Sequence, residues 1–217
     1  LVGAGANVNF TMACTGPGVS PRIFSSLGLG VMTGRIEIVS MLLKKGAAVN
    51  PPIRPLEGET PNGAADISPL GLAAMAGRTD MASLLIRKGA AVNGRCNVFG
   101  DTAPDNATIV DRLTPLQLAA RAGHPGMVKL LLGKKANAHA KSDRGATALI
   151  MALPPLPADR LQGNAELKSR TEIVKLLIAK GADVHVKDRD GASALQSARR
   201  NGYPDAEKAL TRAGARE

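Results

Sequence analysis

The sequence predicts an all-α solenoid built from stacked helix-turn-helix pairs. The clearest evidence is the stretch from Ser68 to Asn93, where apolar residues recur at helical spacing on both sides of a break at Gly77 and stop at Gly89. Each predicted helix is shorter than the roughly 12 to 15 residues at which an isolated helix becomes marginally stable in water. The pair must therefore bury its apolar faces against similar pairs, and such pairs are present elsewhere in the chain.

The related stretches begin at positions 25, 68, 114, 147 and 193, and the shortest step between them runs from 114 to 147. We assign repeats to 25–50, 68–93, 114–139, 147–185 with an insertion at 154–170, and 193–217. Residues 1–9 match only the end of a unit, and we expect a longer polypeptide to precede them. The whole of 1–217 is then a single domain in which each unit contacts its neighbours.

Three segments carry a family resemblance: TPLQLAARAGH at 114–124, EIVKLLIAKGADVH at 172–185 and DRDGASAL at 188–195. They resemble the ankyrin repeat, whose unit consists of a β-turn and two helices and matches the shortest step seen here. The resemblance covers nearly the whole chain. It implies an ankyrin-repeat solenoid with projecting β-turn or hairpin fingers, acting as a non-catalytic protein-protein interaction scaffold or as a structural subunit of a larger assembly.

Three of the fingers are predicted to be elongated. In a unit without an insertion, the connection from its closing residue to the next unit is short, as from His139 to Thr147. The connections that follow Asn9, Asn50 and Asn93 are longer because they contain insertions. Their content of Gly, Pro, Asn and Thr is typical of loops. We expect these fingers, at 10–24, 51–67 and 94–113, to form the main contact with a partner.

The second half of the chain departs from the pattern in three places. Pro154 and Pro155 are expected to end the first helix of the fourth unit, and the later part of that insertion is predicted to extend the second helix backwards. The last unit has polar residues where earlier units have Leu, as a C-terminal cap requires. Lys135 replaces the glycine that follows the second helix in the other units, so we expect that helix to end less regularly.

No catalytic, cofactor-binding or metal-binding motif is found in the sequence. We expect His124 to have the structural hydrogen-bonding role of the Gly-His pair in the family it resembles. Cys14 and Cys96 lack the spacing of a zinc site or a disulfide scaffold, which indicates a reducing, intracellular compartment. No apolar run is long enough to span a membrane, and no secretory signal is visible.

The net charge of +10 has a periodic component. One position near the end of the second helix is lysine in four successive units, forming a Lys ladder of Lys45, Lys88, Lys134 and Lys180. Such lysines complement the helix dipole and keep the chain soluble. The alternative interpretation is an adaptor to nucleic acid or an anionic membrane surface, or to an acidic protein. The ladder lacks aromatic residues for stacking on bases, which disfavours single-stranded nucleic acid.

The resemblance also implies a concave binding groove, formed by residues late in the first helices together with the fingertips. In the groove these are Met32, Thr33, Met75, Ala76, Arg121 and Ala122, and in the fingers they are Phe24, Ile53 and Phe99. An alternative for the two methionines is packing against the elongated fingers. The apolar finger residues are expected to lie on the groove, on each other or on the partner.

Overall fold

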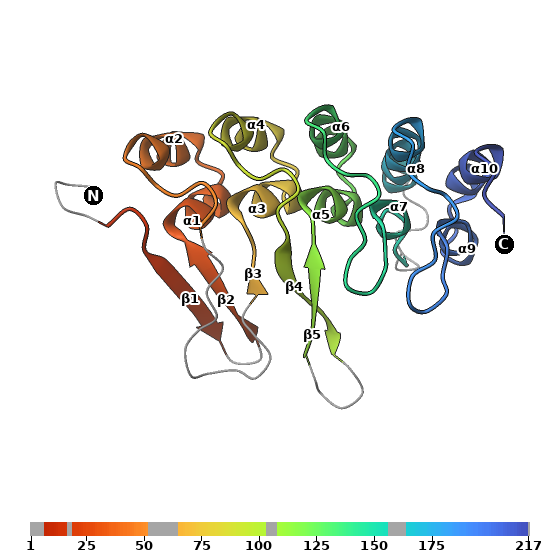
Figure 1. The fold of residues 1–217 in the computed structure, drawn as a ribbon, viewed down its shortest axis with the longest axis horizontal. Helices are drawn as coiled ribbons and strands as arrows, with labels where there is room; N and C mark the ends of the chain where they lie inside the picture. The colour runs from red at the N-terminus through yellow and green to blue at the C-terminus, as the bar shows by residue number, and fades with distance from the viewer. Residues whose placement is uncertain (1–6, 17–18, 52–64, 103–107, 156–163, 217) are drawn as a thin grey trace.

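The structure is a computed structural model that describes residues 7–16, 19–51, 65–102, 108–155 and 164–216. Its helices form two rows that run side by side along the molecule (Figure 1). The first helices of the repeats make one row: α1 (Ser26–Thr33), α3 (Pro69–Met75), α5 (Pro115–Ala122), α7 (Ala148–Met151) and α9 (Ala194–Arg200). The second helices make the other: α2 (Ile36–Lys44), α4 (Thr79–Arg87), α6 (Pro125–Gly133), α8 (Asn164–Ala179) and α10 (Pro204–Arg212). The predicted all-α solenoid of helix pairs is confirmed.

Most first helices begin in the same way, with a Ser or Thr hydroxyl that accepts a backbone N–H three residues further on. The N-caps are Ser25, Ser68, Thr114 and Ser193, and the last two form complete capping boxes with a glutamine. Thr147 is the exception, because its buried hydroxyl has no partner among the described residues and its helix, α7, has only four residues. The two prolines that follow α7 account for its early end.

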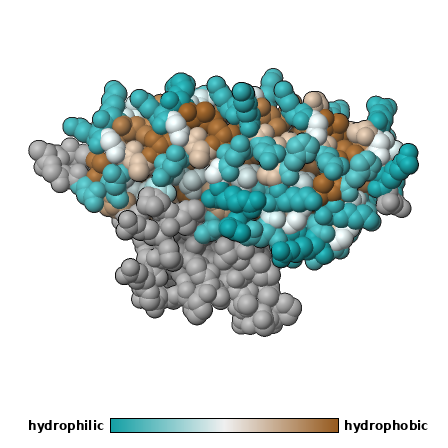
Figure 2. All heavy atoms as spheres, viewed as in Figure 1, coloured by the Kyte–Doolittle hydropathy of each residue, from teal (hydrophilic) through white to brown (hydrophobic). Residues whose placement is uncertain are grey.

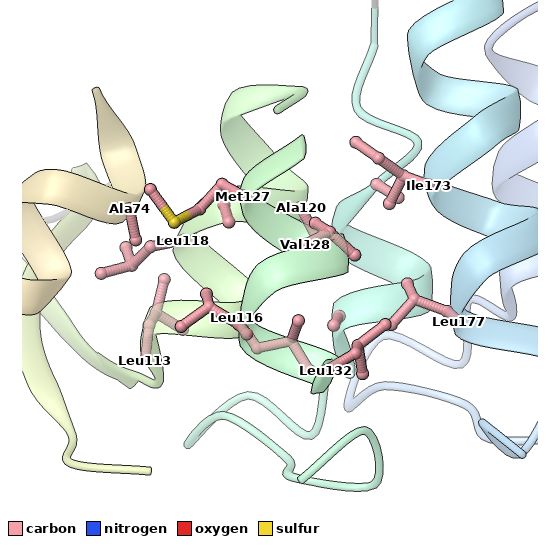
Figure 3. Packing of buried hydrophobic residues seen from close by; sticks show 14 of the residues in the cluster. Ala74, Leu113, Leu116, Leu118, Ala120, Met127, Val128, Leu132, Ile173 and Leu177 are labelled. Carbon is pink, nitrogen blue, oxygen red and sulfur yellow. The ribbon is translucent and has the colours of Figure 1, made fainter. Parts of the chain in front are cut away.

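The core is a stack of small and large side chains on successive helix pairs. Figure 3 shows Leu118 and Met127 of one repeat directed toward Ala74 of the repeat before it, and Val128 directed toward the next repeat, where Ile173 lies. All five residues are at most 2% exposed. At these two boundaries Ala74 and Ala120 let the neighbouring backbones approach, while the longer side chains fill the space between them.

Strands form in the predicted fingers. In the first, β1 (Thr11–Gly16) pairs with β2 (Val19–Ser25) in an antiparallel hairpin, and β3 (Ala65–Asp66) adds to β2 in parallel. In the third, β4 (Cys96–Thr102) pairs with β5 (Thr108–Leu113). Both hairpins project from the side of the first helices (Figure 1). These strands were not located from the sequence, because the composition of the segments is typical of loops. Each strand is defined by pairing with a partner segment and not by an apolar pattern of its own.

Two expectations about the second helices have different outcomes. The second helix of the fourth unit does extend backwards, since α8 begins at Asn164 and has 16 residues. The expected irregular end of α6 is wrong: Lys135 takes the left-handed conformation itself, with φ of 64°. Ala136 N then donates to Leu131 O at 3.0 Å, as Ala90 N does to Leu85 O in the preceding repeat. The helix end is thus kept at the cost of backbone strain in Lys135.

Adjacent repeats are also joined at their exits by asparagine side chains, which we call the Asn clamps. The Oδ1 atom of Asn50 accepts a hydrogen bond from Ala91 N at 2.9 Å, and its Nδ2 atom donates to Gly89 O at 2.9 Å. Asn93 makes the equivalent pair of bonds to the following repeat. Asn9 does the same, accepting from Ala48 N at 2.7 Å. Each clamp holds the exit of one repeat against the residues that follow the second helix of the next repeat.

Candidate functional site

The surface of the first helices is held in place by a set of hydrogen bonds that we call the inter-repeat spine. Its members occupy one position of the repeat: Arg78, His124, Arg170 and Tyr203. Three of them directly precede a second helix, whereas Arg170 lies within α8, which begins earlier than the other second helices. Each donates to a backbone carbonyl at or just after the end of the preceding repeat's first helix, where carbonyls lack the full set of helical hydrogen bonds. Arg78 donates to Val31 O, and His124 Nε2 to Met75 O at 2.9 Å. This bond confirms the structural role predicted for His124.

The spine continues through the longest insertion. Arg170, which sequence reasoning left inside the inserted segment, is buried and donates to Ala120 O at 2.9 Å and to Arg121 O at 2.7 Å. Tyr203 Oη donates to Pro154 O at 2.8 Å. Burial raises the pKa of Tyr203 to about 12, because the charged phenolate is poorly solvated there. The last turns of the first helices are therefore fixed by the following repeat.

Glycines at the ends of the first helices make room for the spine. Gly77 has a positive φ of 66°, and a Cβ atom there would lie 2.7 Å from the imidazole Nδ1 of His124. At Gly34, with φ of 75°, a Cβ would lie 2.8 Å from the guanidinium of Arg78. Both positions therefore require glycine for backbone conformation and for space.

The predicted groove residues lie in one row, one residue after the buried end of each first helix. Met32 is 46% exposed and Met75 is 37% exposed, whereas the residues before them, Val31 and Ala74, are fully buried. Arg121 is exposed at the same position of α5. Thr33 and Ala76 are exposed beside the methionines, and Ala122 is partly buried. The structure thus places an apolar pair, followed by a cation, along three consecutive helices.

The three predicted finger contacts have different outcomes. Phe24 is only 4% exposed and belongs to the core, directly before the N-cap of α1. This burial corrects the prediction that Phe24 contacts a partner, because its ring offers almost no accessible surface. Phe99 lies in β4, where its backbone is in register with Val110. Ile53 lies outside the described residues.

A charged cavity of about 370 Å³ lies next to Arg121, and sequence reasoning missed it. Asp111, Arg144, Asp188 and Asp190 line it together with Arg121. Asp111 is buried and accepts a hydrogen bond from Asp143 N at 2.8 Å, while Arg144 and Asp190 form an ion pair at 3.4 Å. These residues come from β5, α5 and two separate loops, so no local motif could have indicated the cavity.

A second charged cluster lies at the base of the third finger. Arg112 Nε is 2.9 Å from Asp143 Oδ2, and Arg95 is 3.6 Å from the same carboxylate. The hydrogen bond from Arg112 lowers the pKa of Asp143 below its ordinary value. These contacts connect the β4–β5 hairpin to the loop that follows the third repeat. The finger is therefore anchored at its base beside the charged cavity.

The Lys ladder lies along the second helices. Lys45, Lys88 and Lys134 are the C-cap residues of α2, α4 and α6, and Lys180 directly follows α8. All four are exposed, and none forms an ion pair within the described ranges. Figure 2 shows hydrophilic side chains projecting on either side of an apolar strip along the row of second helices. The ladder is thus a set of solvated cations at negative helix ends.

Two further observations concern site chemistry. Among the described residues, no group of three or more His, Cys, Asp or Glu side chains is arranged to hold a metal ion. No helix in that part of the chain combines the length and apolar character needed to cross a membrane.

Comparison with protein-family models gives matches over more than half of the chain. A model described as "Ankyrin repeat" matches residues 66–97 and 111–143. A second, described as "Ankyrin repeats (many copies)", matches residues 164–210. A search of curated proteins finds no matching relative. The matched ranges include the second, third, fourth and fifth helix pairs of the structure, apart from α7 and the end of α10.

Proposed function

The chain belongs to the ankyrin-repeat family, and from this premise we propose that it is a non-catalytic scaffold, or a structural subunit of a larger assembly, whose partner is a protein. Ankyrin repeats generally serve as modules for protein-protein interaction. Membership of the family does not define the partner, which must be inferred from the surface of this chain.

The proposed partner surface is the row formed by Met32, Met75 and Arg121, with the projecting hairpins beside it. The observation that carries the proposal is the exposure of two methionines at the same position of adjacent first helices, next to fully buried neighbours. Exposed apolar side chains in register favour association, and methionine adapts its flexible side chain to a partner's shape. We infer that the partner places apolar side chains over α1 and α3 and an acidic or hydrogen-bond-accepting group near Arg121.

The test is a pair of charge-matched double variants. Proteins retained by the immobilised chain are identified by mass spectrometry, and the affinity of the purified partner is then measured for Met32→Glu/Met75→Glu and for Ile36→Glu/Met41→Glu. Ile36 and Met41 are 37% and 41% exposed but lie on a second helix. We expect at least about a tenfold loss of affinity for the first variant only, equivalent to about 1.4 kcal/mol. Equal losses in both variants would contradict the proposed surface.

The second candidate function is electrostatic, with the Lys ladder binding nucleic acid or an anionic membrane surface. It is supported by the four exposed lysines, which have no ion-pair partners in the described part of the chain. Changing all four to Glu should then abolish binding to duplex DNA or to phosphatidylserine vesicles and remove its salt dependence. Binding that persists in this variant assigns the ladder to solubility.

The proposed setting is an intracellular, reducing compartment. The two cysteines of the chain have neither zinc-site nor disulfide-scaffold spacing, which supports this location. Cys96 is fully buried and lies 3.2 Å from the hydroxyl of Ser68, where it packs as a small core residue.

A further inference from the structure

We propose that the exposed face of the second helices docks on an anionic membrane surface, with a strip of apolar side chains entering among the lipid headgroups while the Lys ladder contacts their phosphates. The proposal rests on the second candidate function above, because it uses the same lysines, but it names lipid as the ligand and adds an apolar contact. The row of second helices lies on the side of the molecule away from the hairpins, so docking there leaves the proposed protein-partner surface free (Figure 1).

The apolar strip is formed by one position of the second helices, which we call the strip position. The residue there is apolar in each of α2, α4, α6, α8 and α10: Met41, Leu84, Leu130, Leu176 and Ala209. The residue after it is buried in all five helices, whereas Met41 is 41% exposed and the other four strip residues are only partly buried. An apolar strip is visible along this row (Figure 2). Packing in the core therefore leaves part of each strip side chain available for contact.

The strip is most exposed at α2, where a second apolar residue adjoins it. Ile36 is 37% exposed. A cavity of about 520 Å³ lies between α2 and α4, and Ile36, Met41 and Leu84 line it together with Glu37, Ser40 and Lys44. Exposed aliphatic side chains around an open cavity are suited to the boundary between lipid headgroups and acyl chains.

The Lys ladder lies beside the strip on the same helix face. Each of its four lysines comes four residues after a strip residue, a spacing that makes the two side chains neighbours on a helix. A further exposed cation adjoins every strip residue, either three residues after it or directly before it: Lys44, Arg87, Lys129, Lys175 and Lys208. Within the described ranges, only Lys208 of these cations forms an ion pair, with Asp205 at 3.7 Å. The strip is therefore bordered by cations along its length.

Carboxylates lie on the other border of the strip. The position four residues before the strip position holds Gly126 in α6 and an acid in the other four helices: Glu37, Asp80, Glu172 and Asp205. The eight residues from this position to the ladder correspond to about 12 Å of helix, which exceeds the screening length of about 8 Å at physiological ionic strength. The ladder side of the face therefore keeps its positive potential, and the membrane meets the strip from that side.

The combination of an apolar strip with a row of cations favours lipid over nucleic acid. Basic amphipathic surfaces bind anionic membranes through buried apolar area and electrostatic attraction together. Nucleic acid would use the lysines but gain nothing from the aliphatic side chains, and the ladder lacks aromatic residues that stack on bases. The strip also continues across helices that pack about 8 to 10 Å apart, which suits an extended planar surface.

The test uses two charge-matched double variants and vesicles made of equal parts of phosphatidylserine and phosphatidylcholine. Ile36→Glu/Met41→Glu places two acids on the face of the second helices, and Met32→Glu/Met75→Glu places two on the first helices. We expect partition onto the vesicles at physiological salt to fall by at least about tenfold in the first variant and by less than about threefold in the second. This order is the reverse of the one expected for the protein partner, so the failure of either proposal is seen separately. Circular dichroism checks that both variants remain helical.

A neutral variant separates the apolar contact from electrostatic attraction. Ile36→Gln/Met41→Gln leaves the net charge unchanged and should lower vesicle partition by about fivefold or more, because less apolar surface enters the headgroup region. Any binding to duplex DNA should be the same in this variant as in the original chain.

A gain of binding tests the cation border. Gly133 comes three residues after Leu130, and no atom lies within 4 Å of the place that a Cβ would take there. Gly133→Lys should raise vesicle partition by about fivefold, since it adds a cation beside the strip. Gly126→Lys, on the carboxylate border of the same helix, is the matched control and should raise it by less than about twofold.

Any of three results would overturn the proposal. The first is an equal loss of vesicle binding in the two charge-matched variants. The second is an Ile36→Gln/Met41→Gln variant that binds vesicles as tightly as the original chain while the ladder variant with four glutamates does not, which would leave the second candidate function standing without an apolar contact. The third is an original chain that does not bind the anionic vesicles but retains an acidic protein through Ile36 and Met41, which would show that a protein occupies this face.

Discussion

At the residue scale, the most informative position is the one that the inter-repeat spine occupies. Arg78, His124, Arg170 and Tyr203 differ in charge and shape, yet each is long enough to bring an N–H or O–H donor to the preceding repeat. Sequence reasoning recognised only His124, through its Gly-His pair. An alignment by residue identity cannot reveal the others, because what they share is a long side chain that ends in a hydrogen-bond donor.

Lys135 provides a test of backbone strain. Its φ of 64° is unfavourable for a residue with a Cβ atom, and its side chain is exposed. We expect Lys135→Gly to increase the free energy of unfolding by about 1 kcal/mol, since left-handed geometry carries no steric cost in glycine. Urea unfolding measures the change. Lys134→Gly, at the preceding residue with φ of −98°, should not stabilise the protein, and equal stabilisation by both variants would contradict this explanation.

Tyr203 predicts a loss of stability at high pH. Its folded-state pKa of about 12 exceeds the ordinary value of 10.0, so its contribution is complete below pH 10 and is lost as the pH rises toward 12. The loss should reach up to about 1.4 kcal/mol per pH unit within that window. The chain has one Tyr and no Trp, so tyrosinate absorbance reports this residue alone.

The control for this prediction is Tyr203→Phe. At neutral pH it should cost about 1 kcal/mol, because the hydrogen bond to Pro154 O is removed. The difference in stability between the two proteins should then shrink as the pH approaches 12. A difference that stays constant, or a titration midpoint near 10, would show that the phenol is not buried in solution.

At the element scale, helices could be located from the sequence and strands could not. Apolar spacing located the helix pairs, and the two prolines located the end of α7. Fingers were expected, but the strands of the β1–β2 and β4–β5 hairpins could not be placed, because their segments are rich in turn-forming residues. The charged cavity was missed for a related reason: Asp111 of β5 meets Arg144 and Asp190, from two separate loops, only in the folded stack.

Arg170 tests how the inserted segment is joined to the stack. Its buried guanidinium bonds to Ala120 O, Arg121 O and, at 3.3 Å, to Glu166. We expect Arg170→Ala to lower the free energy of unfolding by about 3 kcal/mol, because Arg121 O and the Glu166 carboxylate lose this donor and Ala120 O keeps only its bond from Gly123 N. Arg170→Lys should restore part of this loss, since an ammonium can reach one carbonyl but lacks the planar fork. Arg189→Ala is the exposed control, and a loss of similar size there would refute the assignment.

At the scale of the whole molecule, stability is distributed along the stack, because each repeat contacts only its neighbours. In the described part of the chain, α1 and α2 have a neighbouring helix pair on one side only, whereas α3 to α6 have a neighbouring pair on both sides. Amide exchange should therefore be slowest in α3 to α6 and faster in α1 and α2. Exchange measured by mass spectrometry on peptic fragments checks this order, and equal protection of the first and third helix pairs would contradict it.

The repeat organisation was predictable from sequence because one helix pair cannot be stable alone, so its apolar pattern has to recur. The exposure of Met32, Met75 and Arg121 was predictable because these residues differ between repeats, where packing does not determine the residue. Their contact with a partner stays a prediction. The burial of Phe24 was not predictable, since it depends on the hairpin that leads into α1.

The direction of the inter-repeat spine has a consequence for synthesis on the ribosome. Every spine bond runs from a later residue to an earlier one, across sequence separations of 47 to 50 residues. A newly made first helix therefore emerges without these side-chain donors at its end and receives them only after the following repeat has been translated. During translation, the most recently made first helix therefore lacks its spine bonds until the following repeat has emerged. A translational pause directly before a second helix would prolong this incomplete state.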